Sequence, residues 1–190
     1  IREYNATHGT RHEDWNTVHL NRRVPSAATE TVRRDWEEFT RSIVSLLWIR
    51  ADEAAAPLYR AFMQAKYGDI AGVNRSYESD YTDFESVLFP RACPFDGLAA
   101  ADWEAFLQGW RDPQSGQIYA LPAEMIYYDT VELSFRDFLH ARYQGQLDNL
   151  NTALNTQWQD WQAVLPPQQE WHYRTFLEQT GSKKKTHTHL

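Results

Sequence analysis

The chain has 190 residues and a formal net charge of -7, whereas proteins that bind nucleic acid usually present a basic surface. Its single cysteine, Cys93, excludes an internal disulfide framework and a cysteine-rich zinc site. The 42% of hydrophobic residues argues against disorder, and no apolar run approaches the roughly 20 residues of a membrane-spanning helix. Tryptophan is unusually common, with 8 residues.

Helical signals dominate the chain. In residues 31–49, Val32, Trp36, Phe39 and Ile43 recur on one helical face, which predicts a helix. A second helix is predicted over residues 58–67, where Gly68 supplies a stop and Asp69 a cap for the next helix. Only residues 117–121 and 125–128 look extended, and the latter are equally compatible with a helix. The expected fold is therefore all-α, built from tandem helical hairpins with aromatic-rich loops.

Internal repetition supports this expectation. The segment YRAFMQAKYGDIAGVNRSYESDYTDFESVLFP starts at Tyr59, and FRDFLHARYQGQLDNLNTALNTQWQDWQAVLPP starts at Phe135. The alignment places Asn74 on Asn151, and the opening segment IREYNATHGTRHEDWNTV adds Asn5 as a third copy. So many agreements in order indicate a repeat of roughly 70 residues.

A second shared element, aromatic-x-x-Phe, lies between the copies. It occurs as Trp36 with Phe39, Trp103 with Phe106, and Tyr173 with Phe176. We therefore divide the chain into the end of one repeat (1–25), two complete repeats (26–94 and 95–167), and the start of a further repeat with a polar tail (168–190). Because the chain begins inside a repeat and without methionine, we expect it to be a piece of a longer protein.

The aromatic residues have two interpretations. Rings that recur, such as Phe62, Tyr67, Phe138 and Tyr143, are expected to be buried, because large rings suit a thin core between short helices. Rings that do not recur are candidates for stacking against a carbohydrate ligand. These candidates are Trp48, Trp110, Tyr127 and Tyr128.

The polar residues predict no catalytic residue, no cofactor and no metal site. His8, His12 and Asp14 have spacings that could hold a metal ion, but the repeat places both histidines at aromatic positions of the scaffold. The acidic clusters, including Asp102 with Glu104, lie among polar neighbours and are expected to be solvated. The recurring asparagines are expected to bond the backbone of a following turn, with a ligand-binding amide as the alternative.

The pattern F-[LM]-x-A-[KR]-Y, followed by asparagine and an aromatic segment that ends in proline, resembles a segment of family 42 β-galactosidase-like glycoside hydrolases. It also resembles tandem segments in extracytoplasmic insertions of bacterial sugar ABC transporter permeases. The match covers residues 59–90 and 135–167, with a partial copy at the start. The chain lacks the length and the alternating strands of a catalytic barrel, so no catalytic glutamate is carried over.

The resemblance implies a non-catalytic extracytoplasmic domain, a scaffold or docking region of a carbohydrate permease in a bacterial inner membrane. Its partners would be other parts of the transporter or a substrate-binding protein, and carbohydrate is a further candidate; no nucleic acid is expected. The alternative is a carbohydrate-binding or accessory domain of a glycoside hydrolase, either as a fragment of that enzyme or as a subunit that completes another chain's active site.

Overall fold

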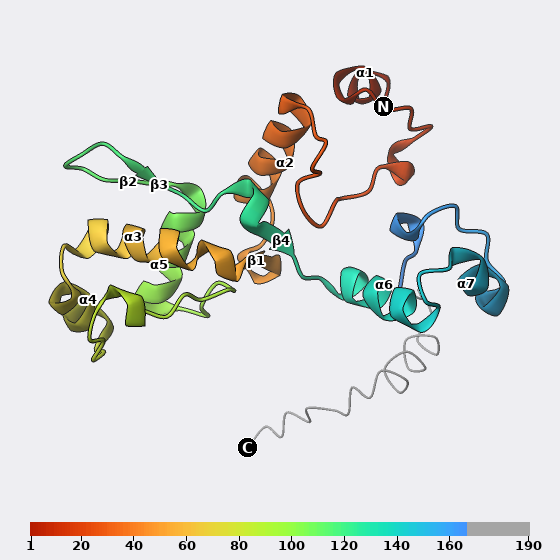
Figure 1. Cartoon of the computed structure of the whole chain (residues 1–190). Coiled ribbons are helices and arrows are strands. Elements are labelled where there is room, and N and C mark those ends of the chain that lie inside the picture. The colour runs from red at the N-terminus through yellow and green to blue at the C-terminus, as the bar shows by residue number, and fades with distance from the viewer. Residues whose placement is uncertain (167–190) are drawn as a thin grey trace. The chain divides into compact units, whose positions relative to one another are not determined.

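The computed structural model describes residues 1–166 (Figure 1). Its helices are α1 (Arg2–His8), α2 (Glu30–Ser42), α3 (Ala56–Tyr67), α4 (Ile70–Tyr77), α5 (Gly97–Gln108), α6 (Val131–Arg142) and α7 (Leu147–Leu154). Its strands are β1 (Ile49–Ala51), β2 (Trp110–Arg111), β3 (Ile118–Tyr119) and β4 (Ile126–Tyr128). Short 3-10 helices are η1 (Trp15–Thr17), η2 (Leu46–Trp48), η3 (Glu53–Ala55), η4 (Phe84–Ser86), η5 (Ala123–Met125) and η6 (Trp161–Ala163).

The chain divides into two compact units. Unit 1 contains Ile1–His12 and Leu20–Asp129, and unit 2 contains residues 13–19 together with the described residues from Thr130 onward. These units are defined by contacts in space, whereas the repeat boundaries are defined by similarity in sequence. The repeat boundaries therefore stay a prediction.

The prediction of an all-α array of hairpin repeats is wrong. Helices and strands are mixed: β1 pairs with β4 and β2 pairs with β3, both antiparallel (Figure 1). The helix predicted over residues 31–49 ends at Ser42, and Ile49 begins β1. From their spacing alone, the apolar residues after Ser42 are as compatible with a continued helix as with a strand. A three-residue strand forms here because it finds a partner strand distant in sequence.

Local signals explain the helix ends. Gly68 adopts a φ of 79° after α3, a backbone conformation that disfavours other residues, and Asp69 Oδ1 accepts the Gly72 N–H at 2.7 Å to cap α4. The predicted stop and cap are thus confirmed. At the corresponding turn after α6, Gln144 and Gly145 have φ values of 54° and 72°.

The pairing of β1 with β4 has a local two-fold symmetry. Arg50 lies opposite Tyr127, and the residues before and after it pair in reciprocal order. The backbone bonds obey the same exchange: Asp52 N–H donates to the Met125 carbonyl at 2.8 Å, and Asp129 N–H donates to the Trp48 carbonyl at 2.9 Å. The two strands therefore occupy equivalent positions and lie antiparallel across a shared axis.

The symmetry extends to the outer edges of these strands. Ala51 N–H donates to the Arg91 carbonyl at 2.7 Å, and Tyr128 N–H donates to the Arg22 carbonyl at 3.0 Å. The residue that precedes each arginine accepts a tryptophan indole N–H at its backbone carbonyl. These bonds join Trp36 Nε1 to Asn21 at 3.1 Å and Trp103 Nε1 to Pro90 at 2.8 Å.

Unit 1 therefore contains two related halves. We call α1, residues 20–24, α2 and β1 the first half, and α4, η4, α5 and β4 the second half. Helix α3 lies between them in sequence and packs on the second half, where it contacts α4, η4 and β3. The second half also carries a strand pairing, β2 with β3, that the described first half lacks.

Aromatic rings fill the core of unit 1 around α3. Phe62 is fully buried, as predicted, whereas Tyr67 is half-buried. In unit 2, Phe138 and Tyr143 are half-buried against a core that two residues of α6 form with one residue of α7 and one that follows η6. The buried members of this core are Phe135, Leu139, Leu150 and Val164.

Candidate functional site

Each recurring asparagine closes the same loop. Its Nδ2 donates to the carbonyl seven residues later, in the pairs Asn5 with His12 (2.8 Å), Asn74 with Tyr81 (2.9 Å) and Asn151 with Trp158 (2.9 Å). Its Oδ1 accepts the N–H of that same residue, at 3.0, 2.9 and 3.0 Å. Oδ1 also accepts a hydroxyl five residues later, from Thr10 (2.7 Å), Ser79 (3.0 Å) and Thr156 (2.9 Å).

These bonds occupy both lone pairs of each amide oxygen. The prediction that the asparagines bond the backbone of a following turn is confirmed. A ligand would have to displace existing bonds before it could use Oδ1.

Each loop ends in a capped 3-10 helix. The carboxylates of Asp14, Asp83 and Asp160 accept backbone N–H groups at 2.8, 2.8 and 2.9 Å. Asp14 is thus used as a cap, and His8 lies beside Asp35 with 3.0 Å between Nε2 and Oδ2. Among the described residues, no three His, Cys, Asp or Glu side chains gather as metal ligands would.

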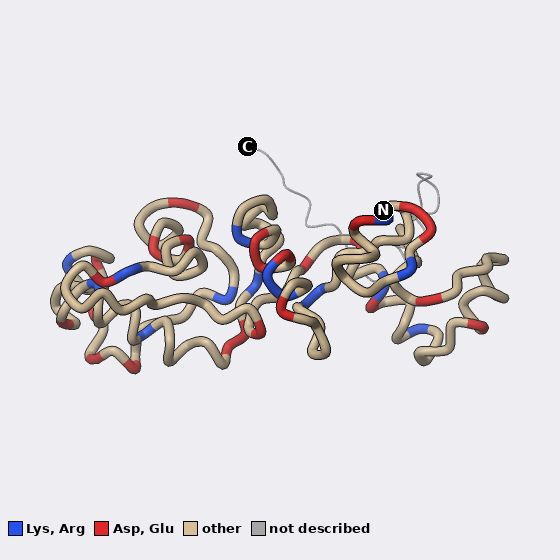
Figure 2. The backbone as a smooth tube through the Cα atoms, turned by 90° about the horizontal axis from the view of Figure 1, so that it is seen from above, with Lys and Arg blue, Asp and Glu red and all other residues tan. Residues whose placement is uncertain are grey.

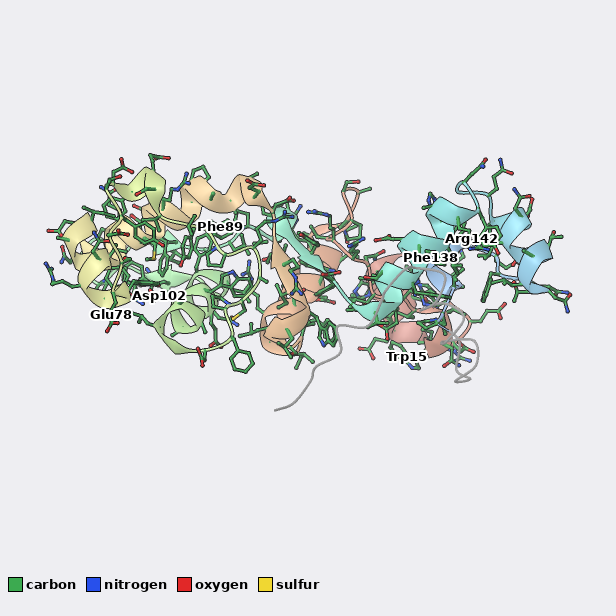
Figure 3. The ribbon with its side chains drawn as sticks, turned by 90° about the horizontal axis from the view of Figure 1, so that it is seen from below. Trp15, Glu78, Phe89, Asp102, Phe138 and Arg142 are labelled. Carbon is green, nitrogen blue, oxygen red and sulfur yellow. The ribbon has the colours of Figure 1, made fainter. Side chains whose placement is uncertain are left out.

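Asp102 on α5 lies at the centre of a polar cluster (Figure 3). The expectation that this carboxylate is solvated is wrong, because its side chain is fully buried. Its Oδ2 accepts hydroxyl bonds from Tyr67 and Tyr77, each at 2.5 Å, and its Oδ1 pairs with the Lys66 ammonium. Burial of a carboxylate is tolerated because it is paired and hydrogen-bonded.

The tyrosines of this cluster are held in their protonated form. Burial raises the pKa of Tyr59, which bonds Tyr77, to about 12. Burial, together with the bond to Asp102, also raises the pKa of Tyr67 and of Tyr77. The cluster therefore joins α3, α4 and α5 through stable donors, and it leaves no carboxylate oxygen open for acid-base chemistry.

The equivalent contact is present in the first half of unit 1. Asp35 precedes Trp36 as Asp102 precedes Trp103, and His8 follows Asn5 by three residues as Tyr77 follows Asn74. The contact between His8 and Asp35 thus corresponds to that between Tyr77 and Asp102. This recurrence in the sequence is the signal that would have revealed the buried Asp102.

The predicted stacking rings do not gather into one site. Tyr128 is buried, with its ring centroid 5.4 Å from that of Trp36 and its hydroxyl 2.5 Å from Thr40 Oγ1. The ring of Trp110 packs 5.6 Å from Phe62. These two rings are used in packing within unit 1.

Tyr127 lies on the less buried face of the strand pair, opposite Arg50. The Arg23 guanidinium lies 4.6 Å from its ring centroid, and Arg91 Nη2 donates to its hydroxyl at 2.8 Å. A cation therefore already occupies one face of this ring. Trp48 is the most exposed of the four predicted rings, and stacking by Trp48 stays a prediction.

Two further features bear on chemistry. Burial raises the pKa of the Cys93 thiol, which disfavours the thiolate that a nucleophile needs. Figure 2 shows Lys and Arg interspersed with Asp and Glu along the described chain, without a long basic stretch. Neither feature supplies the reactive group or the basic surface of an enzyme or a nucleic-acid binder.

Comparison with protein-family models, with curated proteins and with solved structures finds no match. Within residues 1–166, no helix has both the length and the apolar character needed to cross a membrane.

Proposed function

We propose that this chain is a non-catalytic scaffold and docking domain. The observation that carries this proposal is the use of the recurring polar residues. Asn5, Asn74 and Asn151 make the same three bonds within the chain, and Asp102 with its donors joins three helices.

We also propose in which larger protein, and on which side of the membrane, this scaffold acts. The resemblance of residues 59–90 and 135–167 to permease insertions supports an extracytoplasmic position within a bacterial carbohydrate-uptake permease. The partners would be other parts of that transporter or its substrate-binding protein.

Activity and sugar binding provide the first test. We expect the full chain to hydrolyse no chromogenic glycoside, and we expect oligosaccharides to cause no saturable change in tryptophan fluorescence. Turnover that Asp102→Asn abolishes would instead make the polar cluster a catalytic site. A saturable fluorescence change that Trp48→Ala removes would favour the carbohydrate-binding alternative.

The sequence of the parent gene provides the second test. Hydrophobic spans of permease type on either side of this segment are the expected result. Barrel strands with two glutamates at their ends would contradict the transporter setting and favour an accessory domain of a glycoside hydrolase.

A further inference from the structure

Helix α3 covers an aromatic face of the second half of unit 1. The ring centroid of Tyr59 lies 5.2 Å from Phe89 and 5.5 Å from Phe106, and the Phe62 centroid lies 5.5 Å from Phe106 and 5.6 Å from Trp110. Under this helix, Phe106 is only 1% exposed. The face is therefore a docking surface whose occupant is visible in the structure.

The first half carries an equivalent face that no helix among residues 1–166 covers in the way that α3 covers the second half. The matching indole bonds of Trp36 and Trp103 set the alignment, which places Phe39 on Phe106 and Ile43 on Trp110. The matching backbone bonds at the two arginines place Leu20 on Phe89. At these positions Leu20 is 46%, Phe39 41% and Ile43 70% exposed.

The polar contacts show the same difference. In the second half, Lys66 and Tyr67 at the end of α3 donate to Asp102, which is fully buried. The equivalent Asp35 pairs with His8 on the helix that corresponds to α4, and its side chain is 42% exposed. A cation and a hydroxyl delivered by an incoming helix would complete the site at Asp35 as α3 completes the site at Asp102.

We propose that Leu20, Phe39 and Ile43 form a docking surface for an amphipathic helix of the α3 type. Such a helix presents an aromatic residue, then phenylalanine three positions later and methionine or leucine next to it, and it ends in a basic residue followed by tyrosine. This pattern is present in α3 and α6. It consists of Tyr59, Phe62, Met63, Lys66 and Tyr67 in α3, and of Phe135, Phe138, Leu139, Arg142 and Tyr143 in the segment of α6.

The proposal deepens the docking role proposed above and rests on it for the source of the helix, which is the larger protein. Charge and apolar character both favour this occupant: its basic end is complementary to the Asp35 carboxylate, and its rings would pack on the exposed apolar side chains. The exposed side chains of Leu20, Phe39 and Ile43 are thus apolar and occupy the positions that correspond to the residues which α3 covers in the second half.

The test attaches the occupant to the full chain. Ile1 aligns with Ile70, so a copy of residues 55–69 placed directly before Ile1 reproduces the connection from α3 through Gly68 and Asp69. We expect this extension to raise Tm by about 4 °C or more and to slow amide exchange in α2. A matched extension with Tyr59→Asp and Phe62→Asp in the copied segment should give no rise.

Two variants of the chain complete the design. Phe39→Asp should cancel the rise in Tm, whereas Phe95→Asp, at another exposed ring, should leave it intact. Equal Tm and equal exchange for the two extensions would overturn the proposal. So would a dimer of the unextended chain that Phe39→Asp dissociates, because a second copy would then be the occupant. Glycoside turnover by the chain would remove the proposed function and leave the shift in Tm unaffected.

Discussion

The side-chain amide of Asn151 binds the backbone of Trp158 at two points, and the same arrangement is present at Asn5 and Asn74. At the residue scale, this amide replaces the regular hydrogen-bond ladder that a loop lacks, because it satisfies one donor and one acceptor seven residues away. The repeated asparagines are therefore explained by the fold of the loop.

The cost of losing this amide can be predicted. Asn151→Ala removes three hydrogen bonds that involve Trp158 and Thr156, and we expect it to lower the free energy of unfolding by about 2 kcal/mol. Asn149→Ala, on the same helix, removes only an exposed bond to Gln146 and should change it by less than about 0.5 kcal/mol. Urea unfolding measures both, and equal losses would contradict this account of the loop.

Backbone conformation yields a second prediction at the residue scale. Glu78 follows α4 with a φ of 50°, in the left-handed region where the first copy has Gly9 with a φ of 66°. We expect Glu78→Gly to stabilise the chain by about 0.5–1 kcal/mol, because glycine adopts this conformation without strain. Glu104→Gly within α5 should instead destabilise it by about 1 kcal/mol. Thermal unfolding will show whether the two effects have opposite signs.

The tyrosines around Asp102 predict a dependence of stability on pH. Folded Tyr59 keeps its proton to a pKa of about 12, whereas the ordinary value is 10.0. The unfolded chain therefore binds fewer protons above pH 10, and stability falls as pH rises from about 10 to 12, by at most about 1.4 kcal/mol per pH unit for this residue. Tyr59→Phe should make the fall shallower without changing the slope near pH 8. Urea midpoints across pH 8–12 measure this, and an unchanged fall would contradict the role of Tyr59.

At the scale of elements, the pairing of β1 with β4 makes the two strands equivalent. Ile49 and Ile126 occupy matching positions, and both are fully buried. We expect Ile49→Ala and Ile126→Ala to cost similar amounts, about 2–4 kcal/mol each. Ile118→Ala, at an exposed position of β3, should cost less than about 0.5 kcal/mol. A difference between the stability losses of Ile49→Ala and Ile126→Ala as large as that between Ile126→Ala and Ile118→Ala would argue against the symmetry.

The helices could be predicted from the sequence, whereas half of the strands could not. Helix α2 has a long apolar face with a period of 3.6 residues, and α3 ends at Gly68, so both are visible locally. Strand β1 has three residues, and its partner β4 is distant in sequence, so its pairing depends on tertiary structure. The buried Asp102 was missed for the same reason: its hydroxyl donors, Tyr67 on α3 and Tyr77 on α4, are distant in sequence.

At the scale of the whole molecule, the described chain consists of two compact units. Each unit contains its own asparagine-closed loop with the same pattern of hydrogen bonds. The loop of Asn5 and that of Asn74 are closed within unit 1, and the loop of Asn151 is closed within unit 2. A repeat in the sequence therefore corresponds to a repeated set of bonds in space, although the fold mixes helices with strands. The candidate stacking rings do not repeat, and the structure places them apart.

The central claim is that the recurring polar residues serve the fold in every copy. Amide hydrogen exchange of the full chain tests it at the N–H groups of His12, Tyr81 and Trp158. The account predicts that all three amides are protected, and that Asn5→Ala, Asn74→Ala and Asn151→Ala each remove protection mainly at the matching amide. Unprotected amides in the wild-type chain, or an Asn74→Ala variant with unchanged protection at Tyr81, would contradict it.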